Sequence, residues 1–183
     1  MPLPPTTAQR TLKHVRSVQL SGYKRSDGCW DIEARLTDVK DHDYPLSSGL
    51  RKRGEAVHDM WLRVTIDARM GIVDAIASTD AMPYVGHCDR ITPAYRQLIG
   101  LNLFHGFRTA VKTLFRSTRG CSHLSELAMF LPTAALQTFA SDVPDNDDSG
   151  HKPYQLDRCH ALESHSDAVR QYYPRWYRGQ KPG

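Results

Sequence analysis

Apolar and polar residues alternate along the first half of the chain with the period of β-strands. In residues 30–37, the even-numbered positions are apolar and the odd-numbered positions carry charged or hydroxyl side chains. This period-two pattern is typical of a strand with one buried face. Asp27-Gly28 favours a tight turn just before it, because both residues tolerate a positive φ. Residues 14–40 are therefore predicted to form a β-hairpin. The apolar positions of its return strand are Trp30, Ile32, Ala34 and Leu36.

A second pair of alternating segments follows at residues 60–66 and 72–78, separated by a turn at residues 67–71. Residues 41–56, between the two pairs, are expected to be a polar connection, because they are rich in loop formers. Segments that follow one another in this way pair most simply as sequential neighbours. The pattern therefore predicts a four-stranded antiparallel meander.

The second half of the chain changes to the spacing of an amphipathic helix, with apolar residues every three or four positions. Helices are predicted over residues 92–100, 103–117 and 123 to about 140. Ser122 is a suitable N-cap for the third helix. Pro132 is expected to kink or divide that helix, because proline removes a backbone hydrogen bond.

Together these elements predict an α+β fold, in which a four-stranded antiparallel sheet is covered on one face by three helices. Residues 14–178 are expected to form a single domain between a disordered lead-in, 1–13, and a disordered tail, 179–183. The segment from Pro153 onward is rich in Tyr and Trp. We expect this aromatic segment to wrap back across the domain, because large aromatic side chains are usually buried.

Composition narrows the functional classes. The net charge is only +4 and the basic residues are scattered, which disfavours nucleic-acid binding. No apolar run approaches the roughly 18 residues of a membrane span, and the N-terminus lacks the apolar stretch of a secretory signal. The four cysteines have no C-x-x-C spacing, which argues against a zinc finger and a disulfide framework. We expect a cytoplasmic protein that binds a small-molecule substrate or a partner protein and is able to form homo-oligomers.

Three of the cysteines lie within two residues of a histidine. Because thiolate and imidazole suit zinc and iron, we predict metal ligands at Cys88, Cys121, His123 and Cys159. Residues two apart on a helix point about 200° away from each other. Cys121 and His123 can therefore share an ion only if the chain turns at Gly120. The alternative interpretation is that the cysteines are small core residues.

Further polar residues are candidates for catalysis and substrate binding. His58 and Asp59, at the start of the second strand pair, can serve as a general base and its orienting carboxylate. The alternative is a histidine satisfied by loop hydrogen bonds. Arg63 and Arg108 are candidates to hold a substrate carboxylate, although a solvated helix face is the alternative for Arg108.

Acidic residues also gather at the end of the first hairpin, at Asp38, Asp41 and Asp43, together with His42. Hard oxygen ligands or acid–base chemistry are one interpretation of this group. We interpret it instead as a solvated loop face, because charged runs in connections are usually exposed.

The chain contains four longer motifs, namely Gly22–Asp38, His58–Asp67, Gly120–Leu124 and Asp157–Leu162. Together they resemble a bacterial family known as domain of unknown function 2889, over roughly residues 14–178. The family name implies kinship and no particular reaction. A fainter similarity links the strand pair and the following cysteines to iron–sulfur cluster assembly scaffold proteins. That family's middle cysteine should fall near residues 100–106, where this chain has only His105 as a candidate ligand.

Three functions are consistent with these patterns. The first is a metal-binding protein that uses zinc or iron, with enzymatic activity on a small organic acid or thioester. The second is a non-enzymatic accessory or scaffold protein that carries a metal or an iron–sulfur cluster. The third is a metal-free binding module whose cysteines are structural.

Overall fold

The computed structural model describes residues 3–140, 142 and 150–179. Of the predicted terminal segments, residues 1–2 and 180–183 therefore lie outside the described residues. The chain divides into two compact units, Met1–Thr138 and Phe139–Gly183, and each unit is described by itself.

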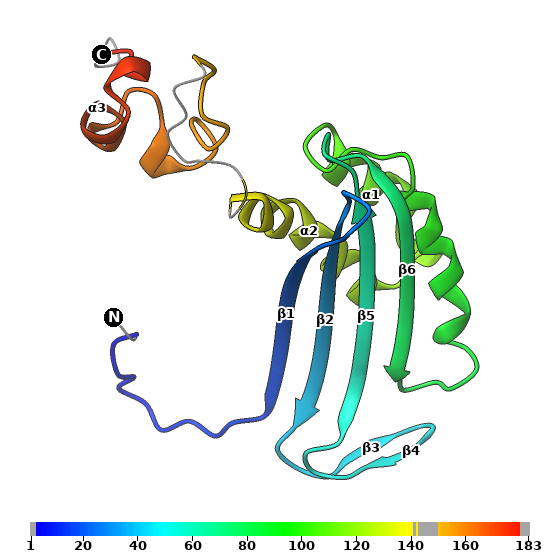
Figure 1. Cartoon of the computed structure of the whole chain (residues 1–183). Helices are drawn as coiled ribbons and strands as arrows, with labels where there is room; N and C mark the ends of the chain where they lie inside the picture. Colours follow the sequence, from blue (N-terminus) through cyan, green and yellow to red (C-terminus); the bar gives the residue numbers. More distant parts are fainter. Residues whose placement is uncertain (1–2, 141, 143–149, 180–183) are drawn as a thin grey trace. The chain divides into compact units, whose positions relative to one another are not determined.

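Four antiparallel strands form the sheet of the first unit, in the order β1-β2-β5-β6 (Figure 1). They are β1 (His14–Lys24), β2 (Trp30–Lys40), β5 (Ala56–Ile66) and β6 (Ile72–Ala81). The four-stranded antiparallel sheet and the α+β class are thus as predicted. The tight turn after β1 is also present, and Gly28 adopts the positive φ of 83° that such a turn requires.

The polar connection between β2 and β5 contains a small hairpin that the sequence did not predict. Strands β3 (Tyr44–Leu46) and β4 (Gly49–Arg51) pair with each other and form a separate two-stranded sheet. Each has only three residues, which is too short for an alternating pattern to be recognised.

The two faces of the main sheet differ in burial. Along β2 the even-numbered residues from Trp30 to Asp38 are buried, and the odd-numbered residues are partly exposed. Helix α2 (Ser122–Ala140) packs on the buried face, which we call the covered face. At one end of the contact, a Cβ added to Gly22 of β1 would lie 1.8 Å from Oγ1 of Thr138. Glycine at this position therefore permits close approach of helix and sheet.

The other helices of the first unit differ in their bounds from the predicted ranges. The first is a 3₁₀-helix, η1 (Asp89–Leu98), which begins earlier than the predicted 92–100 and contains Pro93. Helix α1 (Phe107–Leu114) occupies the middle of the predicted 103–117. A short 3₁₀ turn, η2 (Ser117–Arg119), follows it. Tyr95 of η1 stacks on Phe115 after α1, with ring centroids 4.3 Å apart, and so joins the two segments.

Pro132 does not divide helix α2, which is assigned as one helix of 19 residues. The residues around the proline explain why the helix continues through it. Ala128, Leu131 and Ala135 are fully buried, so tertiary packing supports the helix where the proline removes one backbone bond. None of the helices in the described residues is long and apolar enough to cross a membrane.

The C-terminal unit has a small core of its own. It contains η3 (His160–Leu162), α3 (Asp167–Tyr172) and η4 (Pro174–Trp176). Its aromatic residues therefore find apolar partners within the unit, and the expectation that they wrap across the sheet remains a prediction. The cluster consists of Leu156, Val169 and Tyr173, with Leu162, Trp176 and Tyr177 packed against it.

Candidate metal centre

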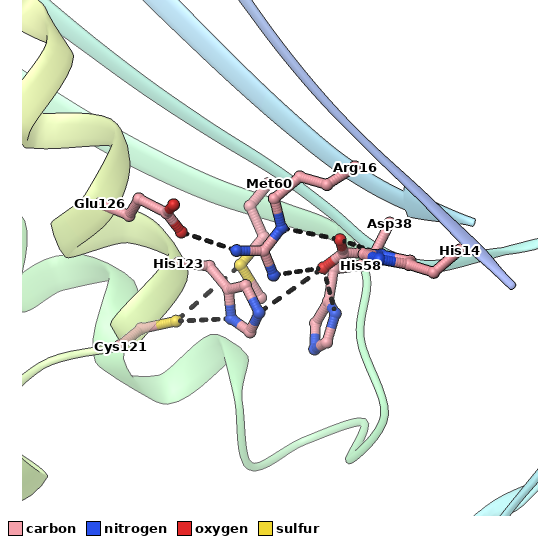
Figure 2. Close-up of polar contacts among 8 residues, drawn as sticks. All are labelled: His14, Arg16, Asp38, His58, Met60, Cys121, His123 and Glu126. Carbon is pink, nitrogen blue, oxygen red and sulfur yellow. Dashed lines mark hydrogen bonds and ion pairs between the residues drawn. The ribbon is translucent and has the colours of Figure 1, made fainter. Parts of the chain in front are cut away.

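A row of three polar residues crosses the covered face near one end of the sheet. Arg16 of β1 pairs in register with Asp38 of β2, and Asp38 pairs with His58 of β5. Cross-strand partners in register point to the same face, so the strand pairing itself brings the three side chains together. Figure 2 shows them converging on the Asp38 carboxylate.

Asp38 is the centre of this row and is only 3% exposed. Arg16 donates to both carboxylate oxygens, from Nε to Oδ1 at 2.8 Å and from Nη2 to Oδ2 at 2.9 Å. His14 Nε2 lies 2.7 Å from Oδ1 and His58 Nδ1 lies 2.9 Å from Oδ2. Burial alone would raise the pKa of Asp38, but the hydrogen bonds from Arg16 and His14 hold that pKa well below its usual range. The carboxylate is therefore ionised.

A β-bulge lies beside the row. Asp38 pairs with His58, whereas the next residue, Val39, pairs with Ala56, so Val57 is the extra residue on β5. Bulges bend a strand locally and change the direction of nearby side chains. This bulge lies where β5 begins, whereas His58 itself continues the even-numbered series of Met60 and Leu62 and so faces the covered side.

Helix α2 adds His123 and Glu126 to the site from the opposite side. His123 Nε2 lies 3.6 Å from Asp38 Oδ2, and its ring lies over that of His58 with centroids 4.0 Å apart. Glu126, one turn further along, accepts a hydrogen bond of 2.7 Å from Nη1 of Arg16. Arg16 is therefore shared by two carboxylates, one from the sheet and one from the helix (Figure 2).

Both histidines favour the neutral form. Burial lowers the pKa of His58, and the nearby Asp38 only partly opposes this effect. Burial also lowers the pKa of His123, and the charges of His58 and Arg16 add to the effect. A neutral imidazole has a free lone pair, which is the form that binds metal ions.

The donor atoms of Asp38, His58 and His123 all lie within 4.8 Å of one another. An ion bound at about 2.0–2.1 Å from each donor in tetrahedral geometry requires donor separations of roughly 3.3 Å. The separations from Asp38 Oδ2, 2.9 Å to His58 and 3.6 Å to His123, lie on either side of that value. Two of the three separations are therefore close to those of a bound transition-metal ion, and the third, between the two histidines, is at most 4.8 Å.

Cys121 lies at the edge of this cluster, immediately before α2. Its Sγ is 3.8 Å from His123 Nδ1 and 3.9 Å from Met60 Sδ. The hydroxyl of Tyr95 fixes its backbone by accepting from the Cys121 amide at 3.0 Å and donating to the carbonyl at 2.8 Å. Cys121 is thus outside the helix, which is the geometric condition for it to approach His123.

Gly120 makes this arrangement possible by its small size. A Cβ at Gly120 would lie 2.5 Å from Cβ of Phe115 and 2.9 Å from the Phe115 carbonyl oxygen. The backbone of Gly120 is extended, so packing against Phe115, and not an unusual φ, requires glycine here.

A pocket of about 490 Å³ opens beside the cluster. It brings together four of the residues selected from the sequence, namely His58, Cys88, Cys121 and His123. Cys88 reaches it from the N-terminus of η1. Neither Cys88 nor Cys121 belongs to a cluster of three close donors in the described part of the chain. Their predicted role as direct ligands remains a prediction.

Three other selected residues lie elsewhere in the first unit. Asp59 follows His58 on β5 and points to the opposite face, where it accepts from Nε and Nη2 of Arg35 at 2.8 and 2.6 Å. Arg63 lies on that same face, with Nη1 3.5 Å from Glu33 Oε1. Arg108 is exposed on α1, and Cys159 is exposed in the C-terminal unit.

Asp38 is the main residue that sequence reasoning placed wrongly. It is a buried strand residue and not part of a solvated loop face. The signal was present, because Asp38 continues the even-numbered series of Trp30, Ile32, Ala34 and Leu36. A charged residue at the end of a buried series indicates a position where the charge is paired.

Neither the curated proteins nor the solved structures include a match to this chain. One family model does match, described as protein of unknown function (DUF2889), over residues 14–137. That range covers more than half of the chain and contains the whole Asp38, His58 and His123 cluster. The chain therefore belongs to the DUF2889 family.

Proposed function

We propose that the chain binds one zinc or iron ion through Asp38, His58 and His123. The observation that carries the proposal is the convergence of one ionised carboxylate and two neutral imidazoles, with all donor atoms within 4.8 Å. Two histidines and one carboxylate are a common set in catalytic zinc sites and in non-haem iron sites, where further positions stay open for substrate.

The surroundings support an oriented metal site. Arg16 and His14 hold the Asp38 carboxylate in place by hydrogen bonds to both oxygens. Cys121 contacts Nδ1 of His123, which leaves Nε2 to face Asp38. Such contacts orient ligands and raise metal affinity in other metalloproteins. Cys121 is in this arrangement a supporting group, and Asp38 takes the ligand place that was predicted for a thiol.

The pocket beside the ion supports an enzymatic use of the metal. A bound zinc or iron ion supplies a Lewis acid that polarises a carbonyl group or activates a water molecule. His58 and His123 both line the pocket, so a substrate there would contact the ion directly.

We further propose that the protein works in a reducing compartment, the cytoplasm, because all four cysteines are free.

Metal analysis of purified, untagged protein tests this proposal. We expect one equivalent of zinc or iron, measured by mass spectrometry of the dissolved protein, and we expect Asp38→Ala and His123→Ala to lower the affinity by at least about 100-fold in chelator competition. Asp41→Ala is the matched control, because Asp41 also contacts a histidine, His42, but without a third donor. Wild-type protein without metal under aerobic and anaerobic conditions, or variants with unchanged affinity, would contradict the proposal.

A second candidate function rests on a different use of the same groups. Cys121 Sγ, His123 and Asp38 form a thiol–imidazole–carboxylate series, with steps of 3.8 and 3.6 Å. Such a series can activate a cysteine that attacks the carbonyl of a thioester and releases its thiol.

Alkylation of the metal-free protein distinguishes the two candidate functions. If Cys121 is a nucleophile, His123→Gln slows iodoacetamide labelling of Cys121 but not of Cys88. If His123 serves the metal alone, both rates stay the same.

A further inference from the structure

We propose that the pocket beside the metal site binds a small organic acid, with its carboxylate on Arg90 and its body directed toward the ion. This inference rests on the proposed metal site and adds the class of ligand. It also assigns a role to Arg90, for which the sequence alone suggested none.

The charge of the pocket favours an anion. Of the thirteen residues that line it, Arg90 is the one that always carries a charge, and none is Asp or Glu. The side chain of Arg90 forms no hydrogen bond or ion pair within the described part of the chain. By contrast, Arg16, Arg35 and Arg63 each face a carboxylate. An unpaired guanidinium beside a pocket is suited to bind a planar carboxylate by two parallel hydrogen bonds.

The remaining lining favours an apolar body of limited size. Met60, Pro83 and Ile91 contribute apolar surface. A volume of about 490 Å³ lies in the range of small-molecule sites. Thr118, Ser122 and His87 supply further polar groups at the same pocket, which can bind a second oxygen of the ligand.

The position of the two histidines determines how the ligand is oriented in the pocket. His58 and His123 belong both to the donor cluster and to the pocket wall, whereas Asp38 and Arg16 do not line the pocket. The open side of the ion would therefore face the pocket. A single guanidinium matches the single charge of a carboxylate, whereas a phosphate dianion usually requires several donors. These features select a monocarboxylate over a phosphate ester.

Binding measurements on the Co²⁺-loaded protein test the inference. Benzoate, phenylacetate and cinnamate are titrated by calorimetry beside their uncharged amides, and phenyl phosphate is a further comparison. We expect at least one acid to bind with a Kd below about 10 mM, about tenfold or more tightly than its amide, and to change the visible spectrum of the cobalt. Arg90→Gln should weaken the acid by about tenfold or more and leave the amide unchanged.

Arg108→Gln is the matched control, because Arg108 is exposed but does not line the pocket. The inference is overturned if no acid binds, if the amides or phenyl phosphate bind equally well, or if Arg90→Gln has no more effect than Arg108→Gln. Metal content is measured first for each protein. Loss of the metal site in the wild type refutes the proposed function, whereas full metal content without acid binding refutes the inference alone.

Discussion

The two faces of the main sheet each hold an arginine–aspartate pair, and the pairs differ in what surrounds them. On the open face, Asp59 is bound to Arg35, whose guanidinium lies 4.8 Å from the ring of Trp61. On the covered face, Asp38 is bound to Arg16 and also meets two histidines of the donor cluster. Both carboxylates have good bidentate partners, so the ion pair itself does not distinguish a functional site from a structural one.

The two carboxylates differ in whether other potential metal donors lie close to them. Asp59 is matched by one arginine at the surface and has no donor cluster around it within the described residues. Asp38 is nearly buried, keeps its charge, and shares its site with imidazoles that favour the neutral form. A buried charge with neutral donors close to it is an environment that binds a cation well.

Adjacent residues on β5 offer the sharpest test of this comparison. His58 and Asp59 follow one another and point to opposite faces. If the proposed metal site is correct, His58→Ala should lower zinc affinity by at least about 100-fold, because it removes one of the three proposed ligands. Asp59→Ala should leave zinc affinity unchanged. Competition with a chromogenic chelator measures both, and equal losses in the two variants would show that the effect is indirect.

The close contact of α2 with the covered face predicts a large effect on stability. Gly22→Ala introduces a Cβ that collides with the side chain of Thr138, and we expect a loss of about 2–3 kcal/mol in the free energy of unfolding. Ser21→Ala, one residue earlier and on the open face, should change that free energy by less than about 0.5 kcal/mol. Urea denaturation measures the two variants. The double variant Gly22→Ala/Thr138→Gly should recover part of the loss if the collision is its cause.

Replacing the arginine of each ion pair should also change the free energy of unfolding, by a smaller amount than Gly22→Ala does. Arg16→Ala leaves the nearly buried Asp38 without its main partner, and we expect a loss of about 2 kcal/mol in the free energy of unfolding. Arg35→Ala exposes Asp59 to water, and its effect should be much smaller. Denaturation at low and at high salt compares them. A larger loss for Arg35→Ala would contradict the distinction between the faces.

The smallest expected effect is the pH dependence of the metal-free protein. Folding lowers the pKa values of His58 and His123, so the unfolded chain binds protons first as the pH falls below about 6.5. Stability is therefore complete above that pH and decreases toward pH 5, by less than about 1 kcal/mol for each histidine. Asp38, whose pKa is lowered, keeps its contribution until far more acidic pH.

His123→Gln should reduce this loss between pH 7 and pH 5, as measured by chemical denaturation at each pH. His87→Gln is the control, because His87 is exposed. A pH profile that stays the same in His123→Gln would mean that His123 is not held neutral by the fold.

The sequence predicted the sheet because one rule, alternation, acts along each strand independently of the rest of the chain. It failed at β3 and β4, whose strands are too short for any period. At Pro132 the helix is not divided, because tertiary packing of Ala128 and Leu131 supports it. His58 and His123 were selected for their chemistry, and the structure places their rings in contact. Arg16 was missed because its role comes from cross-strand register, which a single sequence does not give directly. Asp38 was assigned to a loop face, although it continues the buried even-numbered series of β2.

The three donors of the candidate centre stand at positions 38, 58 and 123, on two strands and one helix. No short stretch of the chain can assemble them, so the unfolded polypeptide offers an ion at most scattered, weak contacts. An ion that binds to this trio would arrive late in folding, after β2 has joined β5 and α2 has docked on both. Once bound, it would favour the folded state by mass action, by about 2.7 kcal/mol at a free concentration 100 times its Kd. Metal binding would then require the completed fold. A lower supply of metal in the cell would reduce the fraction of the chain that is folded.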